Sequence, residues 1–130
     1  MKFLFLDDVR IPGDVTWIQL DNVKWEIVRS YSSAIRWVHD NGFPDVISVD
    51  HDLGYEEVDT SYLDSSGLLI PIVETEEKTG YDFAKFLIDL DIDTNSMPDE
   101  FRFTVHSKNP IGSENIRELL NNYIRFRKTS

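Results

Sequence analysis

The sequence predicts an α/β domain with a short, mainly parallel sheet of about four strands, helices on both of its faces and a long insertion after the third strand. The first observation behind this prediction is that short apolar runs alternate with segments of helical spacing over 130 residues, a length typical of one domain. The second is that three apolar runs end in polar residues, namely Asp7-Asp8, Asp50-His51-Asp52 and His106-Ser107. Because ligands of parallel α/β sheets bind at the carboxyl ends of the strands, these ends predict a functional site at one edge of the sheet.

The N-terminal part of the chain contains two predicted strands. Lys2–Leu6 is apolar on both faces, which is typical of a buried parallel strand. A turn follows at Arg10–Asp14, and Trp17–Leu20 is too short to predict a helix. Lys24–Arg29 alternates between polar and apolar residues and is the second predicted strand.

A helix, a strand and a long excursion come next. Ser30–Asn41 has apolar residues at helical spacing, a serine at its start and an Asn-Gly stop. Asp45–Asp50 is the third predicted strand. His51–Thr79 is an acidic excursion, within which 55–78 is interpreted as an insertion or flap of the single domain 1–130. Its apolar segment Gly67–Val73 is equally consistent with a hairpin arm, a lid or a dimer contact.

The C-terminal part adds two helices and a last strand. Gly80–Leu90 has apolar residues at helical spacing, and Asp91–Glu100 is expected to be an acidic loop. Phe101–His106 is the fourth predicted strand, and Ile111–Arg127 is the last predicted helix.

Composition limits the classes of function. With 13 Lys and Arg against 24 Asp and Glu, the net charge of −11 argues against an extended grip on nucleic acid. The chain has no cysteine, which excludes thiolate catalysis and disulfides. We expect a cytoplasmic protein without a membrane span, whose oligomeric state the sequence does not indicate.

The acidic strand ends predict a metal site. Asp7, Asp8, Asp50 and Asp52 are expected to converge, and such a group of carboxylates favours either protonation or a hard divalent cation such as Mg²⁺ or Mn²⁺. Strand periodicity would place Asp50 and Asp52 on one side and His51 on the other. The alternative is that these acids only terminate strands.

The last strand end predicts an anion site. His106-Ser107-Lys108-Asn109 leads into a helix, so Ser107, Asn109, the later Asn115 and free amides form a candidate phosphate cradle, with Lys108 as a positive charge. His106 could donate a proton to a leaving oxygen. In the alternative interpretation, His106 hydrogen-bonds a carboxylate and Asn109-Pro110 caps the helix.

These motifs resemble a known family. A strand ending in Asp-Asp and a later strand ending in Asp resemble response-regulator receiver domains, which have a flavodoxin-like fold, although a fifth strand ending in Lys-Pro is missing. The fuller resemblance is to cyclic-phosphate processing receiver domains, a divergent group. It rests on four segments spread over nearly the whole chain: Leu6–Pro12, Ile47–Gly54, Thr79–Asp82 and Val105–Ile116.

The resemblance implies a receiver-like fold and hydrolysis of a cyclic phosphate, in RNA repair or nucleotide turnover. The leading hypothesis is a metal-dependent phosphoesterase whose substrate is a small phosphorylated ligand or a cyclic-phosphate end. Asp7, Asp8 and Asp50 would hold Mg²⁺ or Mn²⁺, Asp52 would position water and His106 would protonate the leaving oxygen. Asp50 could instead be the nucleophile, since it stands where receivers are phosphorylated.

Two further residues and two further functions complete the hypotheses. Arg10 and His51 are additional candidates for the site. One alternative function is a receiver-like module that binds metal and phosphate or signals without turnover. The other is an interaction protein whose acidic Leu53–Glu77 arm contacts a partner.

Overall fold

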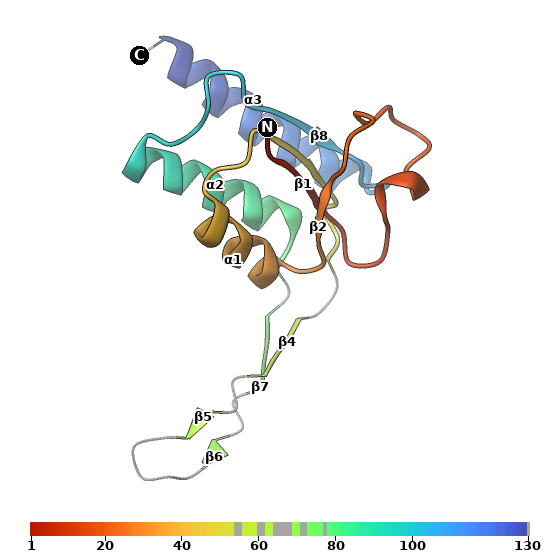
Figure 1. The fold of residues 1–130 in the computed structure, drawn as a ribbon, viewed down its shortest axis with the longest axis vertical. Coiled ribbons are helices and arrows are strands. Elements are labelled where there is room, and N and C mark those ends of the chain that lie inside the picture. Colours follow the sequence, from red (N-terminus) through yellow and green to blue (C-terminus); the bar gives the residue numbers. More distant parts are fainter. Residues whose placement is uncertain (54–55, 60–61, 64–68, 71–72, 77, 130) are drawn as a thin grey trace.

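A computed structural model describes residues 1–53, 56–59, 62–63, 69–70, 73–76 and 78–129. The main body contains four strands and three α-helices (Figure 1). In chain order they are β1 (Phe3–Leu6), β2 (Glu26–Val28), α1 (Tyr31–Asn41), β3 (Val46–Val49), α2 (Gly80–Thr94), β8 (Arg102–Val105) and α3 (Pro110–Thr129). A single 3-10 turn, Pro12–Asp14, lies between β1 and β2.

The four strands form a parallel sheet in the order β2-β1-β3-β8. Leu6 lies beside Val49, which lies beside Val105, so β1, β3 and β8 end at the same level. The predicted receiver-like α/β fold with a four-stranded parallel sheet is confirmed. The aligned ends place the residues after Leu6, Val49 and Val105 along one edge of the sheet.

All three helices cover the same face of the sheet. The strand residues on this face, such as Leu4 and Ile47, share one core with residues of every helix. The helical members of this core that are buried are Ala34 and Val38 of α1, Phe83, Ala84, Leu87 and Ile88 of α2, and Ile116 and Leu120 of α3.

The opposite face is covered by the connection between β1 and β2. Phe5 and Val46 point to this face and pack with Val15 and Trp25 in a second, smaller core. The prediction of helices on both faces is therefore wrong. The physical reason is local, because Pro12 and Gly13 lie in a connection that forms only one 3-10 turn and covers the sheet with apolar side chains instead of a helix. Figure 1 shows this connection on the far side of the strands from α1 and α2.

Helix α2 extends beyond the predicted Leu90. It begins at a capping box, in which Thr79 and Asp82 bond each other's backbone amides, and it ends at Asn95 in the left-handed conformation. The expected acidic loop at Asp91–Glu100 is thus helical up to Thr94. Asp91 is buried there, and its charge is balanced by Arg127 of α3, which forms an ion pair with it at 2.7 Å.

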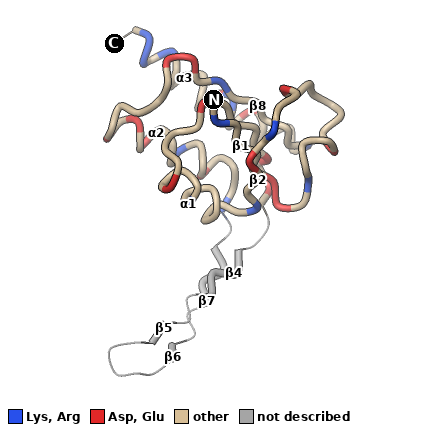
Figure 2. The backbone as a smooth tube through the Cα atoms, viewed as in Figure 1, with Lys and Arg blue, Asp and Glu red and all other residues tan. Residues whose placement is uncertain are grey.

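The basic residues at the end of α3 gather near the C-terminus (Figure 2). Arg127 also donates to the carbonyl of Met97 at 3.3 Å. This side chain therefore ties the end of α2 to α3 in addition to facing solvent.

The described residues of the insertion form two antiparallel strand pairs. β4 (Glu56–Asp59) pairs with β7 (Val73–Glu76), and β5 (Tyr62–Leu63) pairs with β6 (Leu69–Ile70). The interpretations of Gly67–Val73 as an arm, a lid or a dimer contact concern a segment that lies largely outside the described residues. Within the described part of the chain, no helix has the length and apolarity that a membrane span requires.

Candidate functional site

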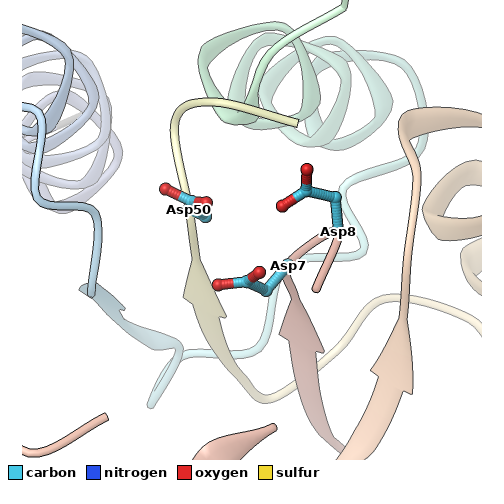
Figure 3. Close-up of side chains that lie close together, drawn as sticks. All are labelled: Asp7, Asp8 and Asp50. Atoms are coloured by element: carbon cyan, nitrogen blue, oxygen red, sulfur yellow. The ribbon is translucent and has the colours of Figure 1, made fainter. Parts of the chain in front are cut away.

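Three carboxylates meet at the carboxyl ends of β1 and β3 (Figure 3). Asp7 and Asp8 follow β1, and Asp50 follows β3, which is held against β1 by a bond from the Asp50 amide to the Leu6 carbonyl at 2.9 Å. One carboxylate oxygen from each of the three lies within 4.8 Å of the others. Asp7 is fully buried and Asp50 is 5% exposed. Of the four acids predicted to converge, Asp7, Asp8 and Asp50 form this cluster, and Asp52 is not part of it.

Asp7 is held by hydrogen bonds from several directions. Its Oδ1 accepts from the amides of Val9 and Arg10, both at 2.9 Å, and its Oδ2 accepts from Arg10 Nη1 at 3.3 Å. Burial raises the pKa of Asp7, but the two amide bonds and the contact with His106 outweigh it and leave the pKa lowered. Asp7 is therefore the fixed, ionised member of the cluster.

Asp8 and Asp50 are shifted the other way. Burial raises the pKa of Asp50, a bond from Ser107 opposes this, and the negative charge of Asp7 adds to the rise. Burial and the charge of Asp7 likewise raise the pKa of Asp8. Each of these two carboxylates would be relieved by a positive charge placed among the three.

A glycine in α2 sets the position of Asp50. The amide of Gly80 donates to the His51 carbonyl at 2.9 Å, and a Cβ built on Gly80 would lie 2.1 Å from the Asp50 carbonyl oxygen. No larger residue fits between the end of β3 and the start of α2. Gly80 is thus a structural requirement of the site.

His106 lies beneath the cluster rather than in it. Its Nε2 is 3.0 Å from Asp7 Oδ2, its Nδ1 is 2.8 Å from Ser48 Oγ, and its ring stacks on Phe5. Thr104 donates to Ser48 Oγ at 2.9 Å, which leaves the Ser48 hydroxyl proton for His106 Nδ1 and the His106 Nε2 proton for Asp7. Burial lowers the pKa of His106, although Asp7 opposes this, so the ring is neutral near pH 7.

The predicted role of His106 as a proton donor to substrate stays a prediction, and the position of the ring favours the other interpretation that the sequence offered. The ring is 0% exposed, and both of its nitrogens already have protein partners. The alternative interpretation from the sequence, a histidine that hydrogen-bonds a carboxylate, describes its contacts. His106 contacts the acidic cluster through Asp7.

A cavity of about 390 Å³ opens beside the acidic cluster. It brings together acids and the segment after β8, and its lining residues are Asp8, Val9, Arg10, Asp50, Asp52, Ser107, Lys108 and Asn109. Asn109 uses its side-chain oxygen to cap α3, accepting from the Gly112 amide at 3.0 Å, so that amide is not free for an anion. The groups that face the cavity are therefore side chains more than free helix amides.

Asp52 and His51 contact each other but line two different cavities. Asp52 lines the acidic cavity, and its Oδ1 is 2.9 Å from His51 Nδ1, a contact that lowers the pKa of Asp52. The His51 ring lies against Gly112, where a Cβ would come within 2.4 Å of it. His51 lines a second cavity of about 590 Å³, and Asn115 is found there too. The structure thus brings Ser107, Lys108 and Asn109 to the acids but places Asn115 elsewhere.

The model of one protein family, described as the cyclic-phosphate processing receiver domain, matches residues 2–122. The chain belongs to this family. No curated protein and no solved structure matches it. The family match agrees with the parallel sheet order β2-β1-β3-β8 and with the acidic ends of β1 and β3.

The acidic cluster of this cyclic-phosphate processing receiver domain fits a divalent cation by its donor set. Asp7, Asp8 and Asp50 offer three oxygen ligands, the type that Mg²⁺ and Mn²⁺ prefer. Two of the three carboxylates have raised pKa values that a cation would lower again. The guanidinium of Arg10 already contacts two of them, which shows that the cluster accepts a positive group.

Two residues of this receiver domain were missed by the sequence interpretation. Ser48 is the buried link between Thr104 and His106, and its signal was a single hydroxyl within an otherwise apolar strand. Trp17 donates its indole N–H to the His106 carbonyl at 2.9 Å and lies beneath Lys108, whose Nζ is 4.5 Å from the ring centre. A lone tryptophan in an irregular loop carries no pattern that would reveal this contact.

Proposed function

We propose that this receiver domain is a metal-dependent phosphoesterase that hydrolyses a cyclic phosphate on a nucleotide or an RNA end. One observation carries the proposal. A single cavity is lined by two acids of a three-carboxylate cluster on one side and by Ser107, Lys108 and Asn109 on the other. This pairing of an oxygen-ligand cluster with positive and hydrogen-bonding groups suits a phosphate ester, and the family description supports it.

In this proposal the acids and the segment after β8 have separate tasks. Asp7, Asp8 and Asp50 hold Mg²⁺ or Mn²⁺, which supplies Lewis-acid polarisation of the phosphoryl group and lowers the pKa of water. Lys108 binds the phosphoryl oxygens as a positive charge, and the Asn109 side-chain amide and the Ser107 hydroxyl, which bond Asp52 and Asp50 in this structure, turn to donate to the same oxygens. We leave Asn115 and His51 out of the phosphate site because both line the second cavity.

Asp52 orients the attacking water. The Asp52 side chain is 64% exposed. His51 Nδ1 contacts its carboxylate, and Asn109 Nδ2 lies 3.4 Å from each of the two Asp52 oxygens. The water oxygen forms a bond to phosphorus and passes a proton to Asp52, one ring P–O bond breaks, and the released oxygen takes a proton from solvent. The product is a phosphomonoester with a free hydroxyl.

His106 has a positioning role in this scheme. It donates to Asp7 and thereby holds one carboxylate of the cluster in its ionised form and in one orientation. His106→Ala is therefore expected to slow substrates with good and with poor leaving groups to the same degree. Greater slowing with poor leaving groups would restore the proton-donor hypothesis.

The test is an assay of the purified chain with 2′,3′-cyclic nucleotides and Mg²⁺ or Mn²⁺. We expect hydrolysis by the wild type, loss of activity in Asp50→Asn, and full activity in Asp40→Asn. Asp40 is a suitable control because it is an acid on the surface of α1, with 65% of its side chain exposed. The proposal fails if the wild type hydrolyses no cyclic phosphate, or if Asp50→Asn is as active as Asp40→Asn.

A module that accepts a phosphoryl group or binds phosphate without turnover is the second candidate. The position of Asp50 supports it, since this carboxylate follows β3 and is flanked by Arg10, 3.5 Å away, and by the Ser107 side chain. A single-turnover reaction quenched in acid separates the routes. A covalent phosphoryl adduct on Asp50, detected by mass spectrometry or by borohydride reduction of that residue, indicates the nucleophilic route, and product formed without any adduct on Asp50 indicates direct attack by water.

A further inference from the structure

Arg10 connects the acidic cluster to the phosphate side of the cavity. Its Nη1 lies 3.3 Å from Asp7 Oδ2 and 3.5 Å from Asp50 Oδ2, so one guanidinium nitrogen spans two of the three carboxylates. Its side chain is 28% exposed and lines the same cavity as Lys108. Arg10 is therefore a positive group at the place where a divalent cation would be held.

A cation and the guanidinium compete for these oxygens. Mg²⁺ binds carboxylate oxygens at about 2.0–2.1 Å and demands a nearly complete octahedron of oxygen ligands. A guanidinium in contact with the carboxylates of Asp7 and Asp50 would block part of that octahedron and repel the ion. Departure of the Arg10 side chain from these two carboxylates would therefore favour binding of the metal.

The backbone of Arg10 restricts how the side chain can move. Its amide donates to Asp7 Oδ1 at 2.9 Å, and its carbonyl accepts from Arg29 Nη1 at 2.6 Å. The main chain is anchored on both sides, so only the side chain is free to turn. The guanidinium carbon is 5.3 Å from the centre of the Trp17 ring, which gives the turning side chain a flat surface beside the cavity.

We propose that Arg10 is a resident counterion of the acidic cluster, that a divalent cation displaces its guanidinium from Asp7 and Asp50, and that the displaced guanidinium binds the phosphate in the cavity. This inference rests on the metal site of the proposed function. It makes the binding of metal and of phosphate mutually dependent through one side chain, because each ligand favours the same displaced state of Arg10. The site would then be completed only when both ligands are present.

Calorimetric titration of Mg²⁺ into the wild type and three variants tests the competition. Arg10→Met removes the competing charge at nearly constant length, and Lys108→Met removes a charge from the same cavity that lies over the Trp17 ring. We expect Arg10→Met to bind Mg²⁺ roughly fivefold tighter or more, in the range usual for coupled sites. Lys108→Met should gain distinctly less. Arg10→Lys, which keeps a charge without the planar fork, should lie between the wild type and Arg10→Met.

A second readout follows the side chain itself. Because Arg10 lies against Trp17, Mg²⁺ should change the tryptophan fluorescence of the wild type, and this change should be absent from Arg10→Met and from Trp17→Phe. Mg²⁺ should also raise the affinity for inorganic phosphate less in Arg10→Met than in Lys108→Met, when each is compared with the same protein without Mg²⁺.

The outcomes separate this inference from the proposed function. If the wild type binds Mg²⁺ and Arg10→Met binds it no more tightly than Lys108→Met does, the displacement of Arg10 is refuted and the metal site stands. If the Arg10 variants behave as expected but no cyclic phosphate is hydrolysed, the enzymatic proposal is refuted and the inference stands. If the wild type binds no Mg²⁺, both are refuted.

Discussion

Replacement of Ser48 by alanine tests the buried chain of hydrogen bonds beneath the acidic cluster. The Ser48 hydroxyl is 2.8 Å from His106 Nδ1 and accepts from Thr104 at 2.9 Å, and both Ser48 and His106 are fully buried. Ser48→Ala leaves His106 Nδ1 without a partner in an apolar surrounding. Thr104 is only partly buried and can bond to water instead.

The expected loss of stability follows from these contacts. A buried polar atom left without a partner costs about 1–3 kcal/mol, so Ser48→Ala should lower the free energy of unfolding by about that amount. For a domain of this size the loss corresponds to a decrease in Tm of about 3–5 °C per kcal/mol. A substitution that merely removed a surface hydroxyl would change stability by less than about 0.5 kcal/mol.

A double-mutant cycle isolates the contact. His106→Phe replaces the imidazole with a ring that needs no hydrogen bond and can keep its stacking on Phe5. Urea denaturation followed by circular dichroism should therefore show that Ser48→Ala costs less in the His106→Phe background than in the wild type. The coupling should amount to about 0.5–3 kcal/mol, the range found for residues in direct contact.

The result that refutes this reasoning is additivity. If the free-energy losses of Ser48→Ala and His106→Phe simply add, the two side chains do not interact, and His106 is not held in one orientation by Ser48. The loss of the bond from His106 to Asp7 occurs in both members of the comparison, so it cancels from the coupling energy.

Three further predictions concern single positions. Asp50→Asn should unfold at the same or a higher urea concentration than the wild type at pH 7. Burial raises the pKa of Asp50 in the folded state, so ionisation of this carboxyl opposes folding once the pH exceeds the ordinary aspartate pKa. Below that pH the difference between the two proteins should shrink, and a large loss of stability at pH 7 would contradict this reasoning. Gly80→Ala should destabilise the fold by about 2 kcal/mol or more and weaken Mg²⁺ binding, since the new Cβ would meet the Asp50 carbonyl. The control Gly13→Ala should do neither, because no atom lies near the Cβ built on Gly13. Equal effects in the two variants would refute the close approach of Gly80 to Asp50. Burial raises the pKa of Asp91, but the hydrogen bonds from Tyr123 and from nearby groups outweigh burial and leave the pKa lowered. The stabilisation by the ionised Asp91 is therefore present above the ordinary aspartate pKa and is lost as the pH falls through the lowered pKa. In thermal unfolding, Asp91→Asn should cost about 1–3 kcal/mol at pH 7 and almost nothing near pH 2, and an equal cost at both pH values would contradict this.

The sequence was most informative where short-range pattern and sheet topology act together. Apolar runs ending in Asp7-Asp8 and in Asp50 were enough to predict that these acids meet, because parallel neighbouring strands end at the same edge. The segment after β8 reached the same cavity for the same reason. The family resemblance drew on the same strand ends.

The sequence was least informative where distant contacts decide the outcome. His106 follows a strand as the acids do, but its side chain faces the side of the sheet covered by the β1–β2 connection, and nothing periodic in that connection indicates that it forms a cover. Asp91 ended a predicted helix because an acid after an apolar run is usually exposed. Its partners Tyr123 and Arg127 come from α3, and only tertiary packing brings them within reach.

The claim on which the account depends is that Asp7, Asp8 and Asp50 together bind a divalent cation. Its most direct test is a titration with Mn²⁺ followed by electron paramagnetic resonance, in which free and bound Mn²⁺ are distinguished without any substrate. We expect the wild type and Asp40→Asn to bind a single Mn²⁺ per chain. Asp8→Asn and Asp50→Asn should bind Mn²⁺ at least about tenfold more weakly, because losing a direct ligand should cost no less affinity than losing a residue that only hydrogen-bonds a ligand. Wild-type protein that leaves all Mn²⁺ free, or Asp8→Asn and Asp50→Asn variants that bind as tightly as the wild type, would contradict the account.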